Sequence, residues 1–170
     1  MTGKWIGAIL VICGCGGVGF SIAASYRREE HTLRRLMNAL EFMECELRCH
    51  LTPLPELCRQ TARESSGTIA GLFSTLAREL DSQVAPDVQS CLRAARMVVG
   101  DIPGKVGQAW DLLGSTLGRF DLEGQIQGLE TVRAFCRREL ETLSRNRESR
   151  LRSYQTLGLC AGAALAILFV

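Results

Sequence analysis

The chain has 170 residues, a length typical of one domain, and its 20 basic and 18 acidic residues give a net charge of only +2. Only Lys4 among the basic residues precedes the first apolar segment, and all acidic residues lie between Glu29 and Glu148. This balance excludes the clustered excess of basic groups that marks a nucleic-acid-binding protein. The abundance of Leu, Ala, Arg and Glu, with few aromatic residues, indicates an all-α fold.

The first element is an uncharged segment, Trp5–Ala24, which is long enough to span a bilayer as a helix. Arg27 and Arg28 follow it, and such a basic flank is typical of the cytoplasmic side of a membrane helix. A cleaved signal peptide is the main alternative, because small residues at the end of the segment weakly resemble a cleavage site. We expect residues 1–26 to form a retained N-terminal transmembrane anchor.

Between residues 27 and 153, apolar residues recur every three or four positions, which predicts helices throughout this region. Proline, glycine and short polar residues divide it into six pieces, and Asp121 is placed to cap the last of them. The predicted helices cover approximately residues 33–51, 54–62, 68–80, 88–98, 106–117 and 121–143.

Six helices joined by short loops predict an antiparallel bundle, and the region contains no alternating strand pattern. An even number of antiparallel helices returns the chain to the end at which it entered. Both ends of a bundle formed by residues 27–153 can therefore be tethered to one membrane.

The last element is a second uncharged segment of seventeen residues, 154–170. A helix of this length reaches about 25 Å, slightly less than a hydrocarbon core. A cluster of arginines precedes it, namely Arg145, Arg147, Arg150 and Arg152. A buried core helix is the alternative, but the basic flank favours a C-terminal transmembrane helix that is entered from the cytoplasm.

Both apolar segments contain small residues four positions apart, a spacing that lets helix backbones approach closely in lipid. In the C-terminal segment these residues are Gly158, Gly162 and Ala166. We expect the two segments to pack against each other or against helices of partner proteins.

The sequence offers little chemistry. Five of the eight cysteines lie between the apolar segments, and an odd number without regular spacing favours buried, reduced thiols over a disulfide framework. Cys45 and Cys49 share a helical face near His50, but structural zinc usually requires paired CxxC motifs. A phosphate-binding loop and a plausible catalytic triad are also missing, so we expect no metal, cofactor, small-molecule substrate or enzymatic activity.

Several segments, in a fixed order, carry a resemblance to a known family. A glycine-rich anchor leads into YRREEHTLRRLMNALEFMECEL, which is followed by TPLPELC, LLGSTLGRFDLEGQ and RSYQTLGLCAGAALAILFV. Together they extend over essentially the whole chain and resemble stage III sporulation protein AB of endospore-forming Firmicutes. The cysteines are not part of the pattern.

The resemblance implies a six-helix cytoplasmic bundle similar to the F platform protein of type II secretion and type IV pilus machines. It also implies membership of the A-to-H complex that joins mother cell and forespore, at the mother-cell membrane around the forespore. The implied partners are the AAA-type secretion ATPase of that complex, AA, and other A-to-H proteins, and a homo-oligomer is compatible with such a role. The expected function is therefore a non-enzymatic membrane platform.

The candidate docking surface is the turn before the last helix, where a helix stop, a cap and polar groups coincide. It comprises Leu117, Gly118, Asp121, Glu123 and Gln125. An ordinary capped turn is the alternative interpretation. The arginines beside the apolar segments could contact an acidic ATPase surface, but lipid headgroups and topology explain them equally well. We expect the membrane-distal loops, rather than these arginines, to face the ATPase.

Two other functions remain open at this point. One is a generic membrane-anchored helical adaptor that is unrelated to secretion. The other is an extracytoplasmic domain with a processed N-terminus.

Overall fold

The computed structural model describes the backbone of residues 2–82, 87–118 and 121–169, and the side chains of residues 25–82, 87–118 and 121–145. The described ranges form helices and contain no strand. The helices are α1 (Thr2–His50), α2 (Leu54–Glu64), α3 (Thr68–Ser82), α4 (Val88–Val99), α5 (Gly104–Thr116) and α6 (Leu122–Phe169). The prediction of an all-α fold with six helices is confirmed.

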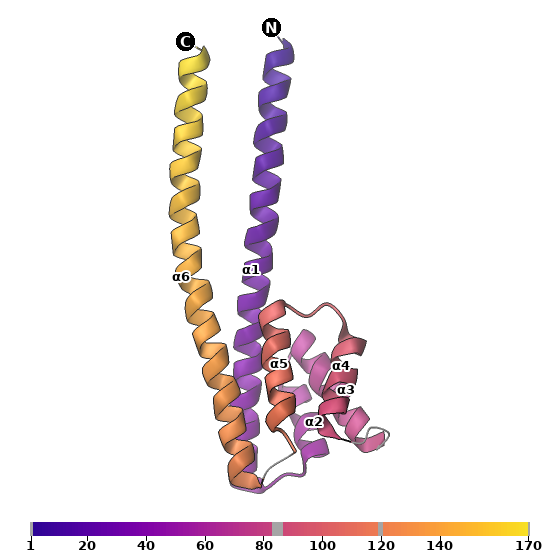
Figure 1. Cartoon of the computed structure of the whole chain (residues 1–170). Helices are drawn as coiled ribbons and strands as arrows, with labels where there is room; N and C mark the ends of the chain where they lie inside the picture. The colour runs from indigo at the N-terminus through magenta and orange to yellow at the C-terminus, as the bar shows by residue number, and fades with distance from the viewer. Residues whose placement is uncertain (1, 83–86, 119–120, 170) are drawn as a thin grey trace.

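Two long helices dominate the structure: α1 has 49 residues and α6 has 48. They run antiparallel and side by side, and both extend on the same side well beyond the four short helices (Figure 1). The chain therefore leaves the bundle at the end at which it entered, as the even number of helices predicted. Each long helix is continuous, so the predicted domain limits at residues 26 and 153 lie inside helices and not at breaks.

The predicted transmembrane segments belong to the parts of α1 and α6 whose side chains are not described. Within the described residues, no helical stretch is both long enough and apolar enough to cross a membrane. The anchor at residues 1–26, the span at 154–170 and the small-residue spacing of Gly158, Gly162 and Ala166 remain predictions.

The four short helices pack beside the half of α1 that is remote from the chain ends (Figure 1). Consecutive helices contact each other from α2 to α6, and α1 contacts α2, α3, α5 and α6. Because sequential neighbours are antiparallel, the loops alternate between two ends of the bundle. The α4–α5 loop lies at the end from which the long helices emerge, whereas the α5–α6 turn lies at the opposite, distal end (Figure 1).

Local sequence explains where the short helices begin and end. Pro53 and Pro103, with φ of −57° and −53°, stand directly before α2 and α5, where a missing N–H costs no helical hydrogen bond. Asp87 caps α4 by accepting a hydrogen bond from the Ser90 amide at 3.3 Å. Gly100 ends α4 at a φ of +75°, a conformation that glycine adopts without strain.

The apolar stripes of all six helices meet in one core. Its largest side chains are Trp110 and Phe73, whose rings pack edge to face with centroids 5.1 Å apart and planes at 76°. The indole N–H of Trp110 donates a hydrogen bond to the Leu92 carbonyl at 3.0 Å, so its polar atom is satisfied inside the core. Both long helices contribute to this core, for example through Leu36 and Leu129, and are thereby joined to the short helices.

Candidate interaction surfaces

Ion pairs join α1 and α6 near the distal end. The Arg133 Nη1 atom lies 2.5 Å from Glu44 and its Nη2 atom lies 3.5 Å from Glu41. Arg48 bridges the two helices, at 3.1 Å from Glu44 and 3.0 Å from Glu130. These contacts set Arg133 opposite Glu44 and thereby define the antiparallel register of the two long helices.

This register has a consequence for the predicted spans. Ala24 lies twenty residues before Glu44, and Tyr154 lies twenty-one residues after Arg133. At 1.5 Å per residue, these distances along the helices are about 30 Å and about 32 Å. The two predicted spans therefore begin at the same level above the bundle, which is the geometry that entry into a single membrane requires.

The start of α5 is tied to both long helices. Arg28 donates to the Asp101 carboxylate at 2.6 Å and to the Asp101 carbonyl at 3.3 Å. Glu29 accepts a hydrogen bond from the Lys105 amide at 2.9 Å, so its negative charge lies at the N-terminus of α5, where the helix dipole favours it. The Lys105 Nζ atom lies 3.1 Å from Glu139 of α6. The α4–α5 loop is thus held against α1 and α6.

The predicted membrane-proximal arginines fall into three groups. Arg28 is engaged by Asp101, whereas Arg27 and Arg145 are exposed. The side chains of Arg147, Arg150 and Arg152 lie outside the described residues.

The turn between α5 and α6 combines residues with different roles. Leu117 is only 1% exposed and its side chain belongs to the core, so it cannot present an apolar group to a partner. Gly118 has a φ of +73°, and a Cβ atom at this position would come within 2.5 Å of Val88. These two residues close the turn, and their role is structural.

Asp121 caps α6, as its position predicted. Its Oδ1 atom accepts a hydrogen bond from the Gly124 amide at 3.0 Å, and its carbonyl accepts one from the Gln125 amide at 2.9 Å. Gln125 is half-buried, whereas Asp121 and Glu123 are exposed. Of the five candidate docking residues, these two carboxylates are the ones whose side chains face solvent.

Two exposed leucines at the distal end were not predicted as site residues. Leu122, 39% exposed, stands between the two carboxylates, and Leu51, 66% exposed, follows the end of α1. The end of α1 and the start of α6 lie together in Figure 1. We call Leu51, Asp121, Leu122 and Glu123 the distal surface. A leucine off the buried stripe of its helix was the signal in the sequence that could have identified Leu122.

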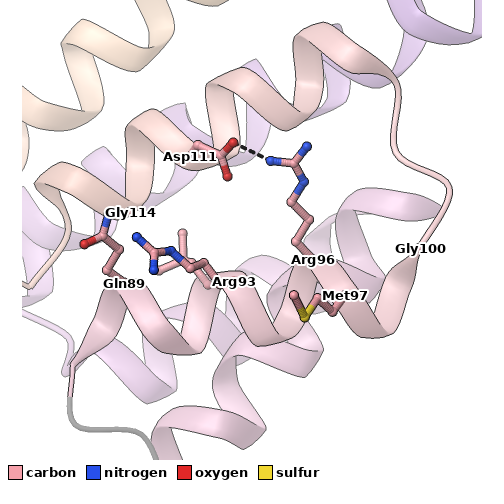
Figure 2. A pocket seen from close by; sticks show the side chains of 8 residues that line it. Gln89, Arg93, Arg96, Met97, Gly100, Asp111 and Gly114 are labelled. Atoms are coloured by element: carbon pink, nitrogen blue, oxygen red, sulfur yellow. Dashed lines mark hydrogen bonds and ion pairs between the residues drawn. The ribbon is translucent and has the colours of Figure 1, made fainter.

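A groove between α4 and α5, with a volume of about 610 Å³, is a second surface that the sequence analysis missed (Figure 2). Arg96 reaches from α4 to an ion pair with Asp111 on α5, while Gln89 lies near Gly114. We call this hollow the α4–α5 groove. Its lining residues are Gln89, Leu92, Arg93, Arg96, Met97, Gly100, Asp111 and Gly114.

The described cysteines fall into two classes. Cys58, Cys91 and Cys136 are buried free thiols, as expected, and burial raises the pKa of Cys58 to about 12 and that of Cys136 to about 11. Cys45 and Cys49 are exposed, contrary to expectation, because they lie off the buried stripe of α1. A hydrogen bond with Cys49 raises the pKa of the Cys45 thiol. Among the described residues, no group of three or more His, Cys, Asp or Glu side chains is arranged so that it could hold a metal ion.

These features define the class of the chain: a small helical bundle carried by two long antiparallel helices, with exposed surfaces at its distal end and between α4 and α5. The chain belongs to the stage III sporulation protein AB family, which it matches over residues 4–170. The resemblance inferred from the sequence is thereby confirmed, and the family is one of sporulation proteins.

Individual relatives agree with this assignment. The chain is 22% identical over 170 residues to stage III sporulation protein AB of Bacillus subtilis (strain 168), covering 98% of this chain and 99% of the relative. A solved structure of stage III sporulation protein AB is similar with a TM-score of 0.63 at 18% identity, covering 72% of this chain and 98% of that chain. The second comparison shows that the fold is shared.

Proposed function

We propose that this chain is a non-enzymatic membrane platform of the A-to-H sporulation complex and that its distal surface docks the ATPase of that complex. The observation that carries the proposal is the position of the bundle at one end of a continuous antiparallel helix pair. The bundle stands on the cytoplasmic side of the mother-cell membrane around the forespore. Its partners are the ATPase and other proteins of the complex.

The helix pair supports the anchoring part of the proposal. The ion pairs of Arg133 fix a register in which both predicted spans begin at one level. Contacts of Lys105, at the start of α5, with Glu29 of α1 and Glu139 of α6 hold the short helices against this pair. Two helices that enter the membrane together resist tilting better than a single anchor, so force applied to the bundle is transmitted to the membrane.

The distal surface supports the docking part. It lies at the end of the bundle remote from the predicted spans, where a cytoplasmic partner has free access (Figure 1). It contains exposed apolar side chains, Leu51 and Leu122, and the exposed carboxylates Asp121 and Glu123. Apolar anchors provide the affinity of protein interfaces, and neighbouring charges provide specificity and faster association.

Affinity purification of the tagged full-length chain from sporulating cells tests this proposal. We expect the ATPase to copurify with the wild-type chain and to be lost from a Leu122→Ser/Glu123→Lys variant, which leaves the Asp121 cap intact. Glu141→Lys, a charge reversal at an exposed position of α6 outside the distal surface, is the matched control and should retain the ATPase.

The same purification distinguishes the alternatives. If the ATPase copurified undiminished with the distal variant but was lost when Arg27 and Arg145 were replaced, docking would be assigned to the arginines. Absence of the ATPase from the wild-type purification, after chemical crosslinking in the cells, would favour a generic membrane-anchored adaptor.

A further inference from the structure

The α4–α5 groove ends beside two strongly exposed apolar side chains. Met97 is 85% exposed and Val98 is 63% exposed, and both lie in the last turn of α4. Met97 also lines the groove and thereby joins its interior to this apolar patch (Figure 2). These side chains offer a partner in the groove an apolar contact.

The two arginines that line the groove differ in their ion pairing. Arg96 is paired with Asp111, and Arg93 makes no ion pair with any described residue. Gly107 allows Arg96 to cross to α5, because a Cβ atom at that position would come within 2.8 Å of the Arg96 guanidinium. Arg96 is therefore committed to joining α4 and α5, while Arg93 remains available for a carboxylate from outside.

The size of the groove matches a short helix. Its lining residues on α4 extend from Gln89 to Met97, which corresponds to about 12 Å along the helix, or slightly more than two turns. At Gly114 of α5 an added Cβ atom would lie 3.6 Å from Leu92 and 3.7 Å from Gln89, so α4 and α5 approach each other closely at the Gln89 end of the groove. A helix can lie along such a channel between two helices.

A second hollow, between α2 and α3, also has an excess of positive charge. It has a volume of about 470 Å³ and contains three arginines and one aspartate, the latter paired with Arg59. Arg63 and Arg78 are exposed and form no ion pair among the described residues. The grooves of the α2–α5 region thus present unmatched positive charge to a partner.

We propose that the α4–α5 groove binds an acidic, amphipathic helix of a partner protein, with a carboxylate on Arg93 and an apolar side chain on Met97. The juxtaposition of an unpaired guanidinium, exposed apolar side chains and a channel slightly more than two turns long selects this occupant. The site is separate from the distal surface, so it provides a second attachment that does not depend on docking of the ATPase.

A binding measurement with the purified full-length chain in zwitterionic lipid nanodiscs tests the proposal. The probe is a fluorescein-labelled, designed fourteen-residue helix with glutamates one turn apart and a leucine in the following turn of the same face. A peptide of identical composition in scrambled order, which lacks that face, is the matched probe. Fluorescence anisotropy reports binding of each peptide.

We expect the designed helix to bind at least about tenfold more tightly than the scrambled peptide, because only the helix presents both groups together. Arg93→Glu should weaken binding at least about tenfold, and Met97→Ser should weaken it about fivefold. Arg137→Glu, the same charge change at an exposed position of α6, should leave the affinity unchanged, and circular dichroism should show equal helix content in all variants.

Equal binding of the two peptides, equal effects of the Arg93 and Arg137 reversals, or failure of the designed helix to bind would each overturn the proposal. A parallel measurement offers vesicles of phosphatidylglycerol to the same nanodisc-embedded variants. If Arg93→Glu abolished vesicle binding while the peptide stayed unbound, the groove would be a lipid-contact surface instead.

Discussion

The two halves of the molecule are held together in different ways. The short helices α2–α5 surround an apolar core centred on Trp110 and Phe73. The distal part of the α1–α6 pair is joined across its flank by charges, with Arg133 between Glu41 and Glu44. Apolar contacts contribute stability without much directional preference, whereas ion pairs favour the register that brings their partners together. The core therefore provides most of the stability, and the charges align the two long helices.

Removal of the central aromatic ring should have the largest effect. Trp110→Ala leaves a large cavity and removes the hydrogen bond to the Leu92 carbonyl, so we expect a loss of about 3–5 kcal/mol of unfolding free energy. Trp110→Phe, which keeps an aromatic ring beside Phe73, should cost clearly less. Urea unfolding of the full chain in detergent, followed by circular dichroism, measures both. A loss below about 1 kcal/mol for Trp110→Ala would contradict a core centred on this residue.

The charged contact is the next test. Arg133→Ala leaves Glu44, which is largely buried, without its partner across the helix pair, and should cost about 2–3 kcal/mol. Arg28→Ala breaks the exposed pair with Asp101 and should cost about 0.5 kcal/mol or less. The same urea unfolding compares them. Equal effects of the two substitutions would remove the distinction between a contact that defines register and an ordinary surface pair.

Substitution of two glycines by alanine tests how closely neighbouring helices approach each other, α6 and α5 in one case and α3 and α4 in the other. A Cβ atom at Gly128 of α6 would come within 2.6 Å of Thr116, whereas one at Gly71 of α3 would lie 3.6 Å from Val99. Gly128→Ala should destabilise the chain by about 1–2 kcal/mol, because overpacking outweighs the gain in helix propensity. Gly71→Ala should stabilise it by about 0.5–1 kcal/mol. Thermal unfolding measures both effects. A melting temperature that shifted in the same direction for both variants would contradict this geometry.

Alkaline pH probes the core through Cys58. Its thiol ionises near pH 9 in the unfolded chain and near pH 12 in the folded chain, so the folded state binds more protons between these values and stability falls as pH rises. This single group should remove about 1.4 kcal/mol between pH 8 and pH 10. Cys58→Ala should lack that part of the decrease. Urea unfolding at each pH measures this difference. If the free energy of unfolding fell equally with pH in wild type and variant, burial would not hold this thiol neutral.

The sequence predicted the helices well because local chemistry determines their limits. Pro53, Gly100 and Pro103 mark breaks that no tertiary contact could reverse, and Asp121 caps α6 as expected. Periodicity also identified the buried stripes. The side chains of the two uncharged segments predicted as spans lie outside the described residues. The structure therefore tests only whether the two segments begin at the same distance from the bundle along α1 and α6.

The candidate sites were harder to predict because they depend on contacts between distant residues. Leu117 was grouped with the docking residues, yet it packs into the core. Arg28 was assigned to the membrane flank, but its partner Asp101 lies 73 residues away in the sequence. The α4–α5 groove requires the pairing of two helices and has no signature in either alone. Composition alone could not separate the exposed Cys45 from the buried cysteines.

The exposed thiols provide the most direct test of the central claim that the bundle stands on the cytoplasmic side of the membrane. Cys45 and Cys49 are accessible in the folded chain, whereas Cys91 is buried and unsuitable as a probe. Intact and lysed vegetative cells that produce the full chain in their plasma membrane are treated with a membrane-impermeant maleimide, and the α1 peptide is analysed by mass spectrometry, with Cys45→Ser/Cys49→Ser as the control. We predict labelling only after lysis. Labelling of this peptide in intact cells would place the bundle outside the cytoplasm and contradict the platform.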